Sequence, residues 1–504
     1  MKKIIAVFLS TFLVLCLFMG CGKEPGIEAK RGLNDYSFSM ASLSGTDRLG
    51  RKVTAMREKK SDKQRYVGVF YWLWAGNHDH QFGVYDNTKL MSTPEGQEAL
   101  FNVTNPPGEG MENASPMMQF HWTNEPLYGY YNASDPWVIA RHIELLTMAG
   151  VDFIFLDTTN HAHYARNFSQ HTAEASQIKG SGIALLDTML EYYNQGWDVP
   201  KVMFYTNTCS GERVDEIYEN YYKSGKYDEL WFAPEGKPMI VGTTEKNGGA
   251  SDMNPEDPSQ YSNISAAMQE YFDVKESQWP TTEPQEYGFP WMSWEYPQHY
   301  HTETKAVNVS VAQHSSINVC FSSRHKWSNR GYDYHTDTIE EDYTAGRNFE
   351  NEWETVFEYE AEGKGVEFVT VTGWNEWIVL KQQGDDYATE TNPNGMMMVD
   401  NFDSEYSRDI EMDKNHYQDN FYMQLVRNMR KFKYSELNET YHWKQTTVDS
   451  LSDFADVDIV YKDFAGDARE RDFYGYDIRR SSVSSGSLGS WYTDTTNRND
   501  IVET

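Results

Sequence analysis

The residues best suited to chemistry form one short stretch, Trp374-Asn375-Glu376-Trp377. An indole face can stack on the apolar C–H face of a pyranose, an amide can bond sugar hydroxyls, and a carboxylate can transfer a proton. We therefore expect a carbohydrate site with Glu376 as a catalytic residue and Trp374, Asn375 and Trp377 as substrate contacts. The alternative is that both tryptophans fill a core, where the amide and carboxylate between them would need buried partners.

A β-strand must position this stretch, because residues 367–372 alternate and are rich in β-branched side chains. Gly373 ends that run. Seven other segments have strand character, at residues 66–74, 151–156, 201–206, 237–241, 271–275, 289–294 and 306–312. Helical patterns fill most of the intervals, at residues 134–149, 183–193, 213–223, 338–361 and 419–432.

The alternation of strands and helices over residues 65–435 predicts an α/β fold. About eight repeats of this kind indicate a parallel sheet closed into a (β/α)8 TIM-type barrel. An open α/β sheet is the competing architecture. No glycine-rich phosphate loop follows any of the predicted strands, so a nucleotide-binding sheet is not expected.

In a barrel of this kind, catalytic side chains gather where the strands end. The predicted strand ends supply Asp157 after the second strand, Glu295 after the sixth and Glu376 in the stretch after the eighth. We predict these three as catalytic candidates, because glycoside hydrolysis needs two carboxylates. Asp157 could instead cap the loop that follows it, and Glu295 could pair with a nearby Lys or Arg.

Further polar and aromatic residues lie at the same strand ends or in the long loop after the first strand. The predicted substrate contacts are Trp74, Asn77, His78, His121, Trp122, Asn207, Trp294, Trp374, Asn375 and Trp377. His314 lies near the end of the seventh strand. For the histidines, a structural role is the competing interpretation.

The stretch at residues 374–377 resembles the Trp-Asn-Glu-Trp signature of barrel enzymes related to glycoside hydrolase families 99 and 71. Residues 69–74, Val-Phe-Tyr-Trp-Leu-Trp, are similar in style to the first strand of these enzymes. The resemblance extends over residues 65–435 and implies a (β/α)8 barrel, hydrolysis of glycosidic bonds and a catalytic role for Glu376. Family 99 endo-mannosidases carry a second catalytic Glu three residues later, where this chain has Val379. The partner of Glu376 would therefore come from Asp157 or Glu295.

The charge of the chain restricts its partners. Lys and Arg number 44 against 76 Asp and Glu, a formal net charge of -32. Because phosphate binding needs a basic footprint, we do not expect a nucleic-acid partner. Aromatic residues make up 15% of the chain, which fits carbohydrate-facing surfaces. The predicted partner is a poly- or oligosaccharide, and no cofactor is predicted.

The N-terminus has the pattern of an export signal. Lys2 and Lys3 precede an apolar run over residues 4–18, and the sequence Leu-Phe-Met-Gly-Cys ends at Cys21. This ending resembles a bacterial lipoprotein cleavage site. We therefore expect a lipoprotein signal peptide at residues 1–21, lipid on Cys21, a tether over residues 22–64 and a location on the outer face of a membrane. A plain secretory signal that is cut nearby is the alternative.

The character of the chain changes after residue 440. Residues 441–504 show few helical periods and many Asp, Ser, Gly and Tyr, which suggests an incomplete β-rich module. Residues 463–467 and 497–500 resemble parts of a DOMON-like sandwich, and this likeness implies carbohydrate binding. The alternative is a tail without a fold.

Cysteines and histidines give weak signals. Apart from the N-terminal segment, only Cys209 and Cys320 remain, which could pair but form no disulfide framework and no zinc cluster. His161 and His163 would suit a metal-dependent carbohydrate esterase or deacetylase, although no zinc spacing accompanies them, so no metal is predicted.

The segment 400–409 carries several acids but lacks the spacing of a calcium loop, so we expect a solvated loop. Its Arg408 could orient a carboxylate. Taken together, the sequence predicts an exported, surface-tethered glycoside hydrolase. The alternative is a non-catalytic glycan-binding lipoprotein on a degenerate barrel, which the absence of an acid at position 379 favours.

Overall fold

A computed structural model provides the structure of the chain. It describes residues 45–47, 51–53, 56–59, 64–76, 83–103, 114–159, 174–207, 209–247, 263–280, 282–313, 328–384, 388, 393–399 and 401–436. Several sequence predictions lie outside these residues, namely the signal segment with Cys21, the 441–504 module, Asn77, His78, His161, His163, His314 and Cys320.

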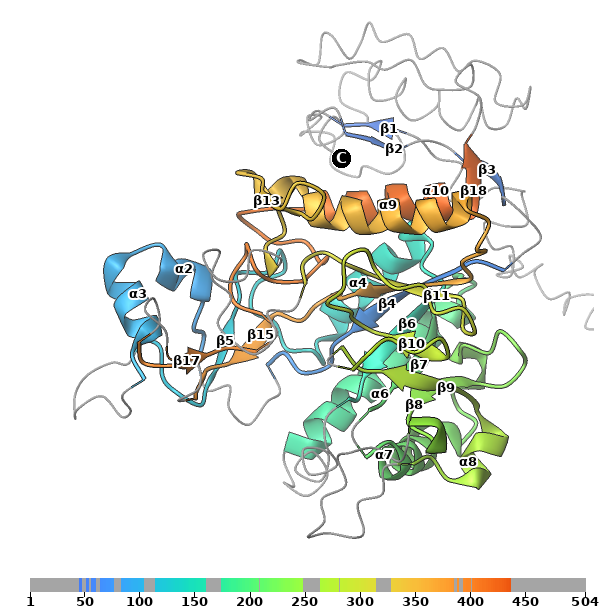
Figure 1. Cartoon of the computed structure of the whole chain (residues 1–504). Helices are drawn as coiled ribbons and strands as arrows, with labels where there is room; N and C mark the ends of the chain where they lie inside the picture. Colours follow the sequence, from blue (N-terminus) through green and yellow to red (C-terminus); the bar gives the residue numbers. More distant parts are fainter. Residues whose placement is uncertain are drawn as a thin grey trace, which may run out of the picture.

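Eight parallel strands form the centre of the molecule (Figure 1). They are β4 (Tyr66–Tyr71), β6 (Phe153–Asp157), β7 (Lys201–Tyr205), β8 (Met239–Gly242), β9 (Asp273–Gln278), β10 (Gly288–Pro290), β11 (Ala306–Ser310) and β14 (Phe368–Thr372). Neighbours in the sheet follow chain order, and β14 lies between β11 and β4. This is the order of a (β/α)8 barrel, so the predicted fold and all eight predicted strands are confirmed, and the open-sheet alternative is wrong.

The register around β4 shows how the barrel closes. Val69 of β4 lies opposite Val371 of β14 on one side and Ile154 of β6 on the other. The ring is incomplete at one place, because β10 and β11 are the two edges of the sheet and share no backbone ladder.

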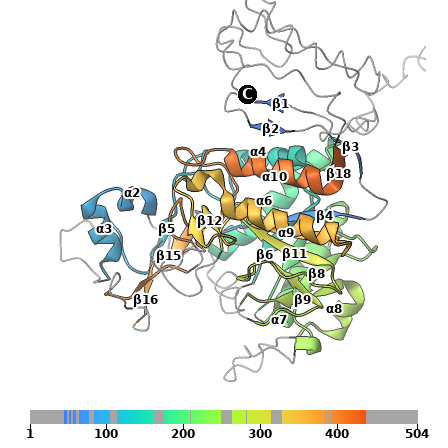
Figure 2. The same ribbon diagram turned by 45° about the horizontal axis from the view of Figure 1, so that its top comes forward.

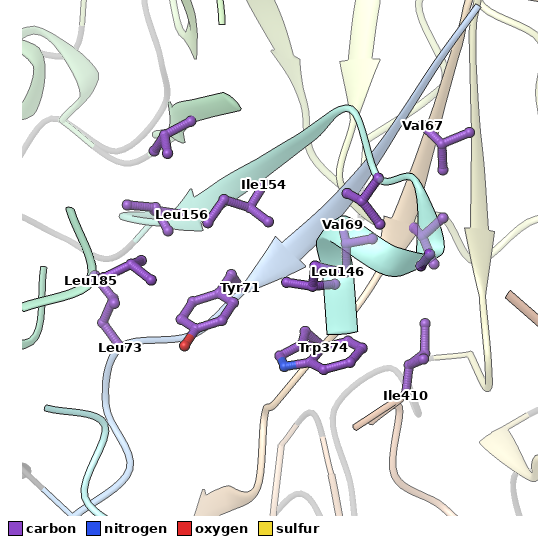
Figure 3. Close-up of a cluster of buried hydrophobic side chains, with 14 of the residues drawn as sticks. Val67, Val69, Tyr71, Leu73, Leu146, Ile154, Leu156, Leu185, Trp374 and Ile410 are labelled. Atoms are coloured by element: carbon purple, nitrogen blue, oxygen red, sulfur yellow. The ribbon is translucent and has the colours of Figure 1, made fainter. Parts of the chain in front are cut away.

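Alternate residues of each strand enter two different cores, as the two-residue period of a strand requires. Phe70 of β4 packs in an inner cluster made only of residues from strands and the segments beside them. Val69 and Tyr71 pack in an outer cluster with Ile143 and Leu146 of a covering helix. Figure 3 shows part of this outer layer.

Helices cover the barrel from outside (Figures 1 and 2). They are α4 (Pro136–Ala149), α6 (Glu174–Asn194), α7 (Ser210–Ile217), α8 (Ala266–Tyr271), α9 (Arg347–Ala361) and α10 (Asn420–Lys433). Short helical turns are η3 (Tyr218–Tyr222), η4 (Asp228–Leu230), η5 (Glu245–Asn247) and η7 (Tyr343–Ala345). None of the described helices is long and apolar enough to cross a membrane.

Local signals set the ends of two helices. Asp135 caps α4 by accepting from the Trp137 N–H at 2.9 Å, and Gly150 ends it in the left-handed region at φ 85°. By contrast, α9 starts nine residues later than predicted. Gly346, at φ 73°, interrupts the helical path, and residues 338–339 form the short strand β13 (Thr338–Ile339) instead.

A small lobe projects from one side of the barrel (Figure 1). It contains α2 (Asn87–Met91), α3 (Pro94–Phe101), β5 (Phe120–Trp122), β15 (Ile378–Leu380), β16 (Gln382–Gln383) and β17 (Met396–Met397). β15 begins directly after Trp377 and pairs with β5, with Ile378 opposite Trp122. The residues that follow the eighth strand therefore continue into this lobe. The remaining short strand in the loop before α9, β12 (Tyr332–Asp333), pairs with β13.

The predicted tether is structured over part of its length. Within residues 45–59 lie β1 (Gly45–Thr46), β2 (Lys52–Val53) and β3 (Met56–Lys59), and β3 pairs antiparallel with β18 (Tyr434–Glu436). Arg51 also donates to the Asp419 carboxylate at 2.7 Å. The tether boundary at residue 64 was therefore wrong, because such short polar strands have no pattern of their own and depend on a distant partner.

Candidate active site

Glu376 lies four residues beyond the end of β14, and its side chain is buried. Glu376 Oε2 accepts a hydrogen bond from Arg408 Nη2 at 2.5 Å. Arg408 is fully buried, and its Nη1 lies 3.6 Å from Met292 Sδ in the inner cluster of the barrel. The expectation that Arg408 could orient a carboxylate is confirmed. A guanidinium held in this way favours the ionised form of its partner.

The segment that carries Arg408 is buried, so the prediction of a solvated loop was wrong. Its polar side chains bond to the stretch after β14 and to one another. Asn401 Nδ2 donates to the Glu376 carbonyl at 2.5 Å, and Asn401 Oδ1 accepts from the Arg408 N–H at 3.2 Å. Burial raises the pKa of Asp409 to about 8, so this acid is mostly protonated at neutral pH.

A second arginine supports the same segment. Arg330 donates to the Asp409 carbonyl at 2.9 Å and to Ser407 Oγ at 2.6 Å. Its guanidinium stacks on Tyr417 and Phe421, 4.1 Å and 4.4 Å from the ring centroids. These contacts fix the backbone from which Arg408 reaches Glu376.

Asn375 is buried and joins the last strand to the first. Its Oδ1 accepts from the Trp72 N–H at 2.8 Å, and its Nδ2 donates to the Trp72 carbonyl at 3.0 Å. Both ends of the amide are therefore used by the backbone after β4. The predicted substrate contact by Asn375 is wrong, since the buried amide links the segment after β14 to the segment after β4.

Trp374 and Trp377 are fully buried, so neither indole offers a face to a sugar. Figure 3 shows Trp374 in the outer cluster with Tyr71 and Leu146. Trp377 Nε1 donates to Glu411 Oε2 at 2.6 Å. The predicted stacking role of both tryptophans is wrong, and the alternative of core packing is correct.

Glu411 is a buried hydrogen-bond partner of the stretch at residues 374–377. Its Oε2 also accepts from the Tyr131 hydroxyl at 2.6 Å, and its Oε1 lies 3.0 Å from His142 Nε2 on α4. His142 Nδ1 in turn is 2.9 Å from the Tyr71 hydroxyl of β4. This network ties the stretch after β14 to the first strand and to the first helix after it.

Asp157 and Asn207 end the second and third strands and are both buried. Asp157 Oδ1 accepts from the Thr159 N–H at 3.0 Å and from Thr159 Oγ1 at 2.7 Å. This is the loop-capping geometry that was the alternative to catalysis. Asn207 Oδ1 accepts from Ser277 Oγ at 2.9 Å.

Glu295 is exposed on the segment after β10. Its N–H donates to Ser293 Oγ at 3.2 Å, and its carbonyl accepts from Gln298 Nε2 at 3.1 Å. Trp294 beside it and Trp74 after β4 are half-buried. Exposed indole surface at these strand ends therefore comes from Trp74 and Trp294, both of which were predicted as substrate contacts.

His121 and Trp122 lie on β5 and are buried. His121 Nε2 is 2.9 Å from Ser115 Oγ, which also accepts from Lys381 Nζ at 2.9 Å. Burial lowers the pKa of His121 to about 3. Their predicted role in substrate binding is wrong, because both are buried: His121 bonds inside the projecting lobe, and Trp122 packs in the outer cluster of the barrel.

The sequence predictions missed a fourth acid on the barrel strands, two residues before the end of β9. Glu276 of β9 is buried and accepts from the Thr244 N–H at 2.8 Å and from Thr244 Oγ1 at 2.6 Å, and burial raises its pKa. The predicted fifth strand stopped at Lys275, one residue before it. Glu276 lines a cavity of about 430 Å³, which none of the three predicted catalytic acids lines.

Asp157 ends β6, whereas Glu295 and Glu376 follow β10 and β14, so all three lie towards the carboxyl ends of the parallel strands. Within the described residues, no group of three or more His, Cys, Asp and Glu side chains has the arrangement of a metal site. Asp157, Glu295 and Glu376 supply carboxylates at this end of the barrel.

Comparisons with known proteins found no matching protein-family model and no matching curated protein sequence. Among solved structures, the chain is similar to two of the GH99 endo-alpha-mannosidase from Bacteroides thetaiotaomicron, one of them in complex with bis-tris-propane. Identity is 13% and 14%, with 73% of this chain and 98% of that chain covered and a TM-score of 0.37. A protein described as glycoside hydrolase-like matches at 13% identity, 75% and 96% coverage and a TM-score of 0.37.

Proposed function

We propose that this chain is an exported glycoside hydrolase that acts on a poly- or oligosaccharide, with Glu376 as one of two catalytic carboxylates. The observation that supports this most directly is the buried Glu376–Arg408 pair at the end of the eighth barrel strand. A carboxylate held in a fixed position by a guanidinium suits the nucleophile or the general base of glycoside hydrolysis.

The second carboxylate is Glu295 or Asp157. Glu295 is solvent-exposed beside the half-buried indole of Trp294, where a sugar ring could stack. Asp157 is buried and bonded through Oδ1 to Thr159. The exposed residue meets the need of a proton donor for access to the leaving group, so Glu295 is the first candidate and Asp157 the second.

The test is product release from a panel of poly- and oligosaccharides by the wild type and by Glu376→Gln. We expect Glu376→Gln to lower kcat by about 10³-fold or more, with smaller losses for Glu295→Gln and Asp157→Asn. Glu367→Gln is the matched control, because Glu367 precedes the same strand at its other end and pairs with Lys305 at 3.0 Å. A wild type that cleaves no glycan, with binding unchanged in Glu376→Gln, would exclude catalysis.

The second candidate function is glycan binding without catalysis. It is favoured by the capping geometry of Asp157 and by Val379, which is buried in the lobe core where family 99 enzymes carry an acid. In that case calorimetry would show glycan binding without turnover. Trp74→Ala and Trp294→Ala would each weaken binding by about 1 kcal/mol through lost stacking.

The lipid anchor is a separate part of the proposal. We infer it from the sequence around Cys21 alone, and Cys21→Ser tests it. If Cys21 carries lipid, the variant moves from the membrane fraction to the soluble fraction of the producing cells. An unchanged distribution would favour the plain secretory signal.

A further inference from the structure

The incomplete side of the barrel, between β10 and β11, is closed by side chains. We call this place the seam. On the inner side, Asn308 of β11 donates through Nδ2 to the Trp291 carbonyl just after β10, at 2.9 Å. The same amide donates to the Thr370 carbonyl of β14, also at 2.9 Å. Asn308 thus links β11 both to its ladder partner β14 and to the segment after β10, with which β11 has no strand ladder.

Glu352 occupies the outer side of the seam. It lies on α9, which covers β11 (Figure 2), and its side chain is fully buried. Its carboxylate accepts from the Ser310 N–H at the end of β11 and from Gln313 Nε2, the latter at 2.8 Å. An edge strand leaves such N–H groups without a partner strand, and Glu352 takes the place of that partner.

The same carboxylate reaches the other side of the seam. Glu352 Oε1 accepts from Gln298 Nε2 at 3.3 Å, and this Nε2 also donates to the Glu295 carbonyl at 3.1 Å. The hydroxyl of Tyr359, seven residues after Glu352 on α9, donates to the Gln298 carbonyl at 2.7 Å. Gln298 therefore connects Glu352 with the backbone of the proposed catalytic segment.

The groups described as bonding to the buried carboxylate of Glu352 carry no charge. Its four donors, Ser310 N–H and the amides of Gln298, Gln313 and Asn348, are all neutral. Burial raises the pKa of Glu352 well above its ordinary value. Such a residue would cost stability unless its hydrogen bonds organised the surrounding segments.

We propose that Glu352 is a positioning residue, which replaces the missing ladder between β10 and β11 and thereby holds Trp294 and Glu295 at the rim. Its effect on glycan turnover rests on the proposed function, whereas its effect on the seam does not. The two parts therefore need separate measurements.

The first measurement is hydrogen exchange of Glu352→Gln. The amide that replaces one carboxylate oxygen is a donor facing donors, so amides in residues 291–298 and 310–313 should exchange about ten-fold faster. Glu350→Gln is the matched control on the same helix, because Glu350 pairs with Arg427 of α10 and, among the described residues, has no hydrogen bond to either edge strand. Equal exchange at the seam in both variants would overturn the proposal.

A second variant covers the case in which Glu352→Gln does not fold. Gln298→Met keeps Glu352 and its bonds to Ser310 and Gln313 but removes the link to Glu295. Faster exchange should then be confined to residues 291–298. Exchange that rises throughout the barrel, or nowhere, would show that Gln298 does not transmit the position of Glu352.

The third measurement separates positioning from general stability. On the glycan that the wild type cleaves best in the panel above, Glu352→Gln should lower kcat about ten-fold with little change in KM, as for misplaced catalytic groups. The effect of Glu352→Gln on kcat should vanish when Glu295 is already replaced by Gln. Additive losses of kcat in the double variant would refute the positioning role. If the wild type cleaves no glycan in the panel, the proposed function is refuted, and the hydrogen-exchange result alone decides whether Glu352 holds β10 and β11 together.

Discussion

Removal of Arg408 gives the sharpest test of how Glu376 is held. In Arg408→Met the Glu376 carboxylate, which is 3% exposed, loses the guanidinium 2.5 Å away. Breaking a buried pair in this way removes the guanidinium from a buried carboxylate and costs about 3–5 kcal/mol of unfolding free energy. Urea denaturation at pH 7 would measure this loss.

The variant should also acquire a pH dependence of known sign. A buried carboxylate without a cation binds a proton more readily than the same group in the unfolded chain. The folded variant then holds more protons, so its unfolding free energy falls as pH rises. The cost of Arg408→Met should therefore be largest at pH 7–8 and smaller near pH 4.5.

Two comparisons make the result decisive. Arg427→Met breaks the partly exposed pair with Glu350 and should cost less than about 1 kcal/mol. The double variant Arg408→Met with Glu376→Gln removes both charges and should recover part of the loss. If Arg408→Met costs no more than Arg427→Met, or if the double variant recovers nothing, the reasoning about this pair is refuted.

Three further predictions concern other buried groups. Asn375→Ala leaves the Trp72 N–H and carbonyl without their partner and should lower the unfolding free energy by about 2–4 kcal/mol, measured by urea denaturation. Burial lowers the pKa of Lys381 from 10.5 to about 7, so the unfolded chain binds the extra proton between these values. The contribution of Lys381 to the unfolding free energy should thus rise from pH 7 to pH 10. Thermal melts over this pH range should show the rise in the wild type but not in Lys381→Met. Because the raised pKa of Asp409 costs stability as pH rises towards 8, Asp409→Asn should match the wild type near pH 4 and exceed it at pH 8 in urea denaturation.

The barrel could be predicted because each strand carries its own signal. The run at 153–157 is apolar up to its terminal Asp157 and completely buried, and the run at 368–372 has the same burial. Helix α4 was predictable at both ends, because Asp135 and Gly150 cap it through local geometry. These features depend on residues close together in the chain.

The burial of the 374–377 stretch could not be predicted in the same way. Trp377 is satisfied by Glu411, and Glu376 by Arg408, both more than 30 positions further along the chain. A short sequence window shows polar groups between tryptophans but not the distant partners that allow them inside. Glu352 was missed for a related reason, because an acid in an amphipathic helix resembles a solvated one until its neighbours are known.

The pairing of β3 with β18 brings the chain that enters the barrel beside the chain that leaves it. Both strands lie where β4 begins and α10 ends, which is the pole opposite the carboxyl ends of the barrel strands (Figure 1). If the segment before residue 56 is attached to a membrane, that pole faces the lipid. The carboxyl ends of the barrel strands, which Glu376 follows, would then face away from the lipid.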